Sequence, residues 1–249
     1  MPNNTILDAV SATWSREAAR GKRVLDLSCG GGHTANMLAR QGYKVVATDY
    51  YPPPELAAGV ERVAGVNLNA FLPFRTASFD AVDLVEVIEH IENQPQLIRE
   101  VSRVLKPGGV FVVTTPNILN LMSRLRFLFT GFLRGRVRPL HYSKKPGRAP
   151  NIYLLHFYEL YYLLFHYGFA ITELSRSRVK FPSRLFMWLL WPFMRFFSFF
   201  AILLPEKDPV QRVYNQQILS YMFHPAILLS DNIIVKSVKT PDSENRPGS

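Results

Sequence analysis

Short apolar runs alternate with amphipathic segments along most of the chain, which is the pattern of alternating strands and helices. The run at 80–85 is nearly continuous in apolar character, as expected for a strand in a parallel sheet. Pro107 and Gly108 suit a tight turn between a helix and a strand. The pattern predicts helices at 5–20, 32–41, 94–105 and 157–167 and strands at 23–28, 43–48, 60–66, 80–85, 110–115, 169–175 and 232–238. This order predicts an α/β fold.

Two insertions interrupt the alternation. Residues 118–150 mix leucine, methionine and phenylalanine with arginine, and residues 176–230 lie between the last two predicted strands. A chain of 249 residues is long enough for one domain with insertions and too short for two ordinary large domains. We therefore expect a single domain over residues 1–249, with a disordered tail at 241–249.

The second insertion contains an apolar segment at 185–204 that approaches the length needed to span a bilayer. The last strand must return to the same sheet, and residues 205–230 are too polar to cross back, so we do not expect the segment to span. A basic and tryptophan stripe lies on this otherwise apolar helix, at Arg184, Trp188, Trp191, Arg195 and Ser198. Such a stripe is typical of a helix in the membrane interface. The alternative is a buried helix packed on its own domain or on a second subunit.

The net charge of +10 is concentrated in one part of the chain. Between Ile118 and Arg184 there are twelve lysine and arginine residues against two glutamates, and the rest of the chain is balanced. Basic charge beside apolar segments indicates an anionic membrane surface as partner. The single cysteine, Cys29, and the lack of a basic and apolar leader lead us to expect a cytoplasmic protein, peripheral on the inner face of the membrane.

A glycine loop follows the first predicted strand. The runs at 24–35 (VLDLSCGGGHTA) and 43–49 (YKVVATD) join a strand, the loop, a helix and a second strand. Gly30 and Gly32 permit a tight turn and a close approach of the backbone to a ligand, which indicates a nucleotide site. The loop also satisfies the dinucleotide pattern of dehydrogenases, but a carboxylate at Asp26 would repel a diphosphate. A carboxylate there suits the cationic amino group of S-adenosylmethionine (SAM).

Four downstream segments strengthen this choice. They are 67–74 (NLNAFLPF), 78–90 (SFDAVDLVEVIEH), 103–109 (RVLKPGG) and 114–117 (TTPN). In order and spacing they resemble the class I SAM-dependent methyltransferases, of the type 11 and type 23 kind. The resemblance implies SAM as cofactor. It also implies a Rossmann-like, doubly wound, mostly parallel seven-stranded sheet with helices on both faces, here with a hydrophobic insertion before the last strand.

The resemblance also implies the cofactor contacts. They are Asp26 for the amino group, Ser28, Gly30 and Gly32 for the loop, Asp49 for the ribose, Tyr50, Asn67 and Leu68 for the adenine, and Glu86 for the methyl-donor pocket. Ser28 stands where the family usually has glycine, so it must take a tight turn. Asn67 stands where many relatives carry aspartate, and its carbonyl can still accept a hydrogen bond. For Tyr50, a plain surface aromatic residue is an equal alternative.

Glu86, Glu89 and His90 place two carboxylates and an imidazole within one helical turn. They resemble the E-x-x-E-H element of ubiquinone-pathway O-methyltransferases, which is associated with a divalent metal. Because many relatives share these letters without known metal dependence, we favour a role in the cofactor pocket and predict no metal site. His90 is the first candidate for a general base, since imidazole titrates near neutral pH, and His156 is the second.

The methyl acceptor stays open between several classes. The basic and apolar insertions, with a looser resemblance to methyltransferases of bacterial cell-envelope glycan synthesis, favour O-methylation of a membrane-associated sugar or glycolipid. A prenylated quinol or phenol is the alternative. A nucleic-acid methyltransferase is disfavoured, because the arginines alternate with leucine and phenylalanine and no base-amine motif follows the fourth strand. Intact cofactor residues disfavour a non-catalytic membrane adaptor, and the oligomeric state stays open.

Overall fold

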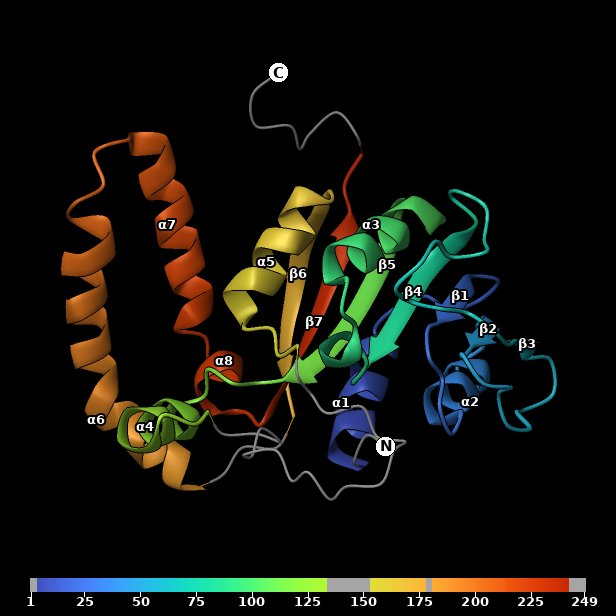
Figure 1. The fold of residues 1–249 in the computed structure, drawn as a ribbon, viewed down its shortest axis with the longest axis horizontal. Helices are drawn as coiled ribbons and strands as arrows, with labels where there is room; N and C mark the ends of the chain where they lie inside the picture. The colour runs from blue at the N-terminus through green and yellow to red at the C-terminus, as the bar shows by residue number, and fades with distance from the viewer. Residues whose placement is uncertain (1–3, 134–152, 178–180, 242–249) are drawn as a thin grey trace.

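A seven-stranded sheet forms the centre of the computed structural model, which describes residues 4–133, 153–177 and 181–241, except for the side chains of 181–186 (Figure 1). The strand order is β3-β2-β1-β4-β5-β7-β6. Neighbours from β3 to β5 pair in parallel, and β7 lies antiparallel between β5 and β6. The strands are β1 (Arg23–Asp26), β2 (Lys44–Thr48), β3 (Glu61–Val63), β4 (Phe79–Val85), β5 (Leu105–Pro116), β6 (Phe169–Arg176) and β7 (Asn232–Lys239). The predicted mostly parallel, seven-stranded sheet is confirmed.

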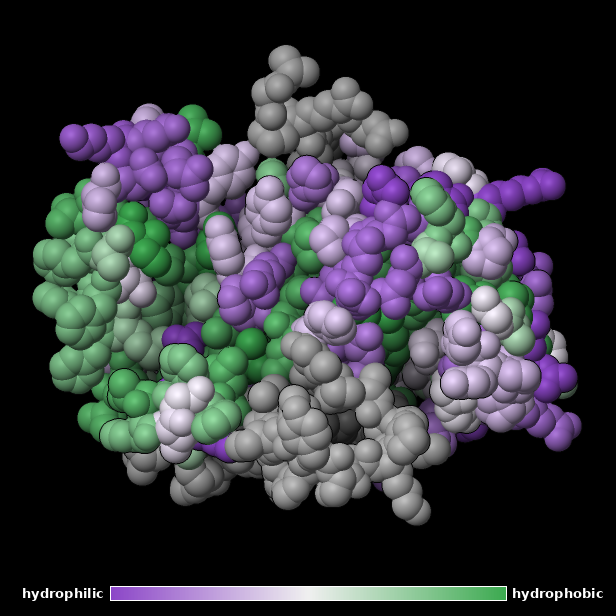
Figure 2. All heavy atoms as spheres, in the orientation of Figure 1, coloured by the Kyte–Doolittle hydropathy of each residue, from purple (hydrophilic) through white to green (hydrophobic). Residues whose placement is uncertain are grey.

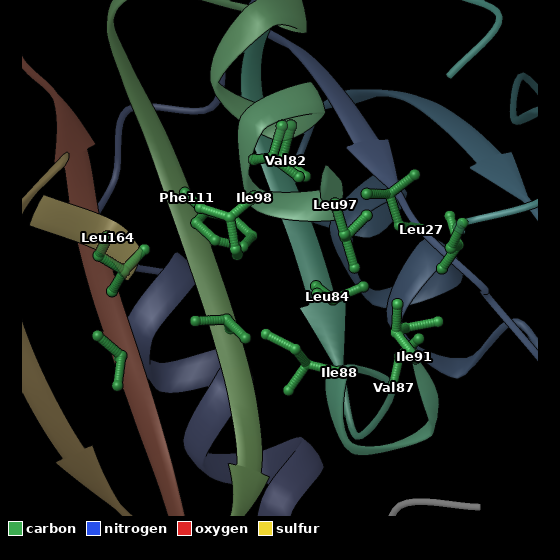
Figure 3. Close-up of a cluster of buried hydrophobic side chains, with 14 of the residues drawn as sticks. Leu27, Val82, Leu84, Val87, Ile88, Ile91, Leu97, Ile98, Phe111 and Leu164 are labelled. Carbon is green, nitrogen blue, oxygen red and sulfur yellow. The ribbon is translucent and has the colours of Figure 1, made fainter. Parts of the chain in front are cut away.

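Helices cover both faces of this sheet. They are α1 (Asn4–Trp14), α2 (His33–Arg40), the 3-10 helix η1 (Ile88–His90), α3 (Gln94–Val104) and α5 (Phe157–His166). Side chains alternate along β5, so Val110 and Val112 pack in one core with α1 and α2, whereas Phe111 and Val113 pack in another with α3 and α5. Figure 3 shows the second core. Burying each such side chain stabilises the fold by about 1.5–3 kcal/mol, so the two cores fix the sheet against both helical layers.

The predicted elements lie close to the observed ones, with differences at their ends. Helix α1 ends at Trp14 rather than near residue 20, and β3 contains only Glu61–Val63. Strand β5 already begins at Leu105, so the predicted turn at 106–109 is an irregularity within the strand. Gly108 has a φ of +74° there, which a glycine adopts without strain. Backbone pairing with Phe79 of β4 therefore extends the strand across a segment that local turn propensity alone would end.

The insertions form helices beside the β6 edge of the sheet (Figure 1). The first contributes α4 (Leu121–Thr130), and its residues 134–150 lie outside the described residues, as does most of the predicted basic cluster. The second contributes α6 (Phe181–Ser198), the π-helix η2 (Phe199–Leu203), α7 (Pro209–Met222) and α8 (Pro225–Leu229).

The apolar segment at 185–204 is one arm of a helical hairpin, because α7 runs back in the opposite direction to α6 (Figure 1). The sequence patterns did not predict α7. In the part of the chain that the structure describes, no helix combines the length and apolar character needed to cross a bilayer. The hairpin returns the chain to β7 in the same sheet, as predicted. The predicted disordered tail lies, from residue 242 onward, outside the described residues.

The Asn117 side chain, directly after β5, anchors α8. The Asn117 amide donates to the carbonyl oxygens of Ile227 and Ser230 at 2.8 and 2.9 Å, and so caps the carboxyl end of α8. Leu121 of α4 packs with Leu228 of α8 in a small apolar cluster. Both insertions are therefore held next to the carboxyl ends of the parallel strands, where ligands bind in open α/β sheets.

Candidate active site

A cavity of about 690 Å³ opens at the carboxyl ends of β1 and β4. Its wall combines the glycine loop after β1, the segment after β3, and η1. This volume lies in the range of small-molecule sites. The predicted site residues that line the cavity are Asp26, Ser28, Gly30, Tyr50, Asn67, Leu68, Glu86 and His90. The predicted residues Gly32, Asp49 and His156 lie outside this lining.

The glycine loop depends on left-handed backbone at three positions. Ser28 has a φ of +60°, which confirms the tight turn predicted there, and Gly30 has a φ of +51°. Gly32, at +74°, caps the start of α2. A Cβ on Gly32 would lie 2.1 Å from Cδ2 of Leu56. Gly32 thus makes room for a protein side chain, whereas Gly30 borders the cavity itself.

Asp49, at the end of β2, fixes the loop from outside the cavity. Its Oδ2 accepts the Gly30 N–H at 2.9 Å, and its Oδ1 accepts the Tyr51 N–H at 3.3 Å. A carboxylate oxygen has two lone pairs, so each oxygen can accept one further donor. The structure therefore gives Asp49 a role in holding the loop that sequence reasoning did not foresee, and leaves its capacity to accept from hydroxyl groups intact.

Two buried carboxylates lie next to each other behind the loop. Asp26 of β1 pairs in register with Asp83 of β4, and their side chains are 2% and 0% exposed. The Trp14 indole N–H donates to Oδ1 of Asp83 at 2.7 Å, and within the described residues neither Oδ2 atom has a hydrogen-bond partner. Burial raises the pKa of both carboxyl groups, and the charge of Asp83 raises the pKa of Asp26 further. Sequence reasoning missed Asp83, although a carboxylate inside an apolar strand was the available signal.

Side chains from β5 and β7 hold Glu86 in place. Its backbone has a φ of +56°, and its N–H donates to the Thr114 hydroxyl at 2.9 Å. That hydroxyl donates to the Glu86 carboxylate at 3.1 Å, and the Asn232 amide lies 2.9 Å from each carboxylate oxygen. Asn232 belongs to β7 and stands 146 positions later in the chain, so no local pattern could have identified it.

The remaining predicted contact residues differ in how much the surrounding protein constrains their side chains. The Tyr50 ring is 61% exposed and meets the Tyr51 ring edge-on at 5.3 Å. The Asn67 side-chain oxygen accepts the Asn69 N–H at 3.0 Å, and Leu68 is buried against the core. The Tyr50 ring is therefore exposed to solvent at the cavity wall, whereas the Asn67 carbonyl is already oriented by its own turn.

Comparison with known proteins decides the family. The family model described as a methyltransferase domain matches residues 4–174, more than half of the chain. The chain belongs to the class I SAM-dependent methyltransferase family. A ubiquinone biosynthesis O-methyltransferase of Xanthomonas oryzae is 38% identical over 126 residues, covering 46% of this chain and 50% of that protein. A probable SAM-dependent methyltransferase of Mycolicibacterium smegmatis is 39% identical over 108 residues, covering 39% of each chain. The chain spans about half the length of the curated relatives it matches.

Solved structures agree on the methyltransferase fold. A SAM-dependent methyltransferase from Archaeoglobus fulgidus has a TM-score of 0.54 and 18% identity, and the match covers 94% of both chains. A phosphoethanolamine N-methyltransferase from Haemonchus contortus, solved with SAM, has a TM-score of 0.52 and 18% identity over 96% of this chain and 53% of that chain. These identities show the fold alone. The predicted Rossmann-like α/β architecture is confirmed.

The cavity of this methyltransferase fits SAM. An ammonium group supplies the donor that Oδ2 of Asp26 lacks among the described residues, and it offsets the repulsion between Asp26 and Asp83. A diphosphate would add negative charge at the same place. Asp49 can accept from ribose hydroxyls while it holds Gly30. The residues present therefore match a ligand that is cationic at one end and carries a ribose, which is the chemistry of SAM.

The two candidate bases are in different places. His90, in η1, lines the cavity. His156 lies outside it, at the start of α5, where its Nδ1 is 3.5 Å from the Glu159 carboxylate. Glu89 is fully buried, and the described part of the chain holds no group of three or more His, Cys, Asp or Glu side chains arranged to bind a metal ion. His90 is therefore the candidate base with access to a bound acceptor.

Proposed function

We propose that this chain transfers the methyl group of SAM to an oxygen atom of an amphiphilic phenol or quinol at a membrane surface. The buried Asp26 carboxylate in a cavity behind a glycine loop is the observation that carries the use of SAM. The curated relatives named ubiquinone biosynthesis O-methyltransferase favour a phenolic acceptor over the sugar or glycolipid favoured by sequence reasoning. The acceptor remains a proposal, because those matches cover 46% and 61% of this chain.

Different residues of the chain have different roles in such a reaction. When bound, SAM supplies an electrophilic methyl group on a sulfonium centre. Asp26 holds its amino group, Asp49 and the glycine loop hold its ribose, and Glu86 borders the methyl-donor end of the cavity. His90 accepts the proton that the acceptor hydroxyl loses, a role that typically contributes about 10²- to 10⁴-fold in rate. Alignment of donor and acceptor supplies several kcal/mol more.

An apolar face on the inserted helices supports an amphiphilic acceptor. Figure 2 shows apolar side chains gathered over α4, α6 and η2. The apolar face consists of side chains that are each more than half exposed, namely Phe127, Leu128, Phe129, Trp188, Leu189, Phe193, Phe196 and Phe197. Beside it, the Arg195 guanidinium lies 4.9 Å from the Trp191 ring. Exposed aromatic residues with a cation at their edge favour contact with the membrane interface.

Labelled SAM tests the acceptor. The full chain is incubated with it and one of three compounds: a prenylated catechol, catechol without the tail, or an alkyl glucoside. We expect label chiefly in the prenylated catechol. His90→Ala should lose about 10²- to 10⁴-fold in turnover, and the matched variant His156→Ala should retain activity. Label in the glucoside alone would overturn the phenolic acceptor, and an active His90→Ala would remove the assigned base.

Vesicle flotation tests the membrane contact. The full chain should float with vesicles that contain phosphatidylglycerol, and the double variant Phe129→Ser with Trp188→Ser should stay at the bottom of the gradient. Val213→Ser removes an exposed apolar side chain of α7 outside the apolar face and serves as the control. SAM affinity, measured by calorimetry, should be the same in all three proteins. Equal flotation of the double variant would contradict the proposed contact.

A further inference from the structure

A second cavity, of about 700 Å³, lies among the inserted helices, away from the residues assigned to SAM. We call it the helical groove. It is bounded by α4, α6 with η2, and α7, and its wall is mostly aliphatic and aromatic, with side chains such as Leu125, Leu190, Phe193, Phe197, Ile218 and Leu219. Along α7 its lining runs from Gln211 to Met222, which at 1.5 Å per residue is a length of about 16 Å. The groove therefore extends along much of α7, and its wall is mostly apolar.

Among the described residues that line the groove, one is a cation. The Arg124 side chain comes from α4, and its Nε donates to the Leu119 carbonyl oxygen at 2.7 Å, which fixes the direction of the guanidinium. Its Nη2 is buried and has no hydrogen-bond partner among the residues that the structure describes. Burial lowers the pKa of Arg124, which reflects the cost of holding this charge away from water. A guanidinium in this position calls for an anionic partner, because its remaining N–H groups match carboxylate and phosphate oxygens.

Two polar side chains of α7 along the groove contact each other, since the Gln211 amide donates to the Asn215 side-chain oxygen at 2.9 Å. Tyr158 and Ser198 also line the groove, and both side chains are uncharged. Among the described residues that line the groove, Arg124 carries the one charge, so it selects the charged end of a ligand. The ligand that matches this arrangement is apolar along most of its length and carries one acidic group at an end.

We propose that the helical groove binds a membrane-derived lipid with a single hydrocarbon chain and an acidic head group. The chain lies along α6 and α7, and the head group accepts hydrogen bonds from Arg124. Leu128, Phe193 and Phe197 of the apolar face also line the groove, so a lipid can pass from a bilayer into it with little contact with water. The site is separate from methyl transfer and does not depend on the identity of the methyl acceptor.

A second copy of the chain is a poorer occupant. An apolar helix from another protomer would cover the aliphatic wall, but it would leave Nη2 of Arg124 buried without a partner. Leaving a charged donor unsatisfied in a closed interface costs more than any other loss of a hydrogen bond. An acidic head group removes that cost and uses the same apolar wall.

Dodecyl phosphate is the probe for the head group, added below its micelle concentration and followed by calorimetry on the full chain. We expect one molecule to bind per chain. Arg124→Gln should weaken binding by about 10- to 150-fold, the range for a hydrogen bond to a charged group. Arg126→Gln, the same change on α4 at a residue that does not line the groove, should bind as the unaltered chain does. Equal affinity of Arg124→Gln and the unaltered chain would overturn the assigned head-group site.

Chain length and a blocked groove test the hydrocarbon site. Affinity should rise roughly 15-fold for each two methylenes from octyl to decyl to dodecyl phosphate, because each buried methylene contributes about fourfold. Leu219→Trp should fill the groove and abolish binding, whereas Val213→Trp, at an exposed position of α7, should not. Thermal unfolding shows whether each variant is folded, and Arg124→Gln tests the site if Leu219→Trp is not.

Three results would overturn the lipid site. Affinity that does not change with chain length would mean that only the phosphate is bound. Binding that survives in folded Leu219→Trp would place the probe elsewhere. Self-association of the chain that Leu219→Trp abolishes, with no binding of dodecyl phosphate, would identify a second copy as the occupant. SAM affinity should be unchanged in every variant, since none of these residues lines the cofactor cavity.

Discussion

Replacing Asp26 with asparagine should weaken SAM binding and also stabilise the ligand-free protein. Asp26 and Asp83 are buried neighbours, and neither Oδ2 atom has a partner among the described residues. An asparagine amide at position 26 removes one negative charge and offers an N–H to the Asp83 oxygen next to it. It also removes the charge that attracts the amino group of SAM. The same substitution therefore has opposite effects on stability and on affinity.

The magnitudes follow from these contacts. Loss of a hydrogen bond between charged groups costs about 1.5–3 kcal/mol, so SAM affinity should fall by roughly 10- to 150-fold. Satisfying the buried Asp83 oxygen should stabilise the ligand-free protein by about 1 kcal/mol or more, which for a chain of 249 residues raises the melting temperature by about 2–4 °C per kcal/mol.

The stability difference should depend on pH. The pKa of Asp26 and of Asp83 is raised in the folded protein, to about 7 for Asp83. Because the folded-state pKa values are raised, these groups do not lower the free energy of unfolding below about pH 4, which is their pKa in the unfolded chain. They lower it as the pH rises through their pKa values in the folded protein. The advantage of Asp26→Asn in the absence of SAM should therefore be larger at pH 8 than at pH 5.

Calorimetric titration with SAM and thermal unfolding at both pH values measure these effects. Asp80→Asn is the matched control on β4, because Asp80 accepts the Arg23 N–H at 2.8 Å and pairs with Lys106 at 2.6 Å. Burial raises the pKa of Asp80, but these two partners lower it by more. Asp80→Asn should therefore reduce stability and leave SAM affinity unchanged. If Asp26→Asn bound SAM as tightly as the unaltered chain, or was less stable at pH 8, the reasoning about the carboxylate pair would be refuted.

Three further predictions concern the framework of the cavity. Asp49→Ala should weaken SAM binding in calorimetry by about 1.5–3 kcal/mol, because it removes a ribose acceptor and frees the Gly30 N–H; tight binding would refute the role. Asn232→Leu should lower the free energy of urea unfolding by about 1–3 kcal/mol, since Glu86 loses both amide contacts, and an unchanged midpoint would contradict this. Gly32→Ala should destabilise more than Gly42→Ala in thermal unfolding, because both have positive φ but only Gly32 has Leu56 within reach; equal losses would show that the clash is relieved.

Much of the fold and the centre of the site could be predicted from local sequence. Apolar runs identified the inner strands of the sheet, because a strand buried on both faces needs apolar residues at consecutive positions. The glycine loop was predicted because Gly30 and Gly32 supply backbone angles that other residues avoid. Ser28 was correctly expected to take such a turn, because it stands where the methyltransferase family usually has glycine. These features depend on residues close together in the chain.

Other features needed contacts between distant segments. The Trp14 hydrogen bond to Asp83 and the Asn232 contacts with Glu86 join residues 69 and 146 positions apart, so no spacing rule could indicate them. His156 was the second candidate base after His90, and the packing of α5 placed it outside the cavity. Local pattern gives no distance between a histidine and a ligand when that distance depends on the packing of the whole sheet.

The helical hairpin also depends partly on local sequence and partly on contacts between distant segments. The apolar composition of 185–204 by itself predicted a helix there, and the need to complete the sheet with β7 predicted that the chain would return. Only the tertiary structure decided that α7 would face α6 and that Arg124 would line the groove between them. Periodicity reports which face of a helix is apolar. The partner of that face is set by packing between segments far apart in the chain, where shape and charge must match at the same time.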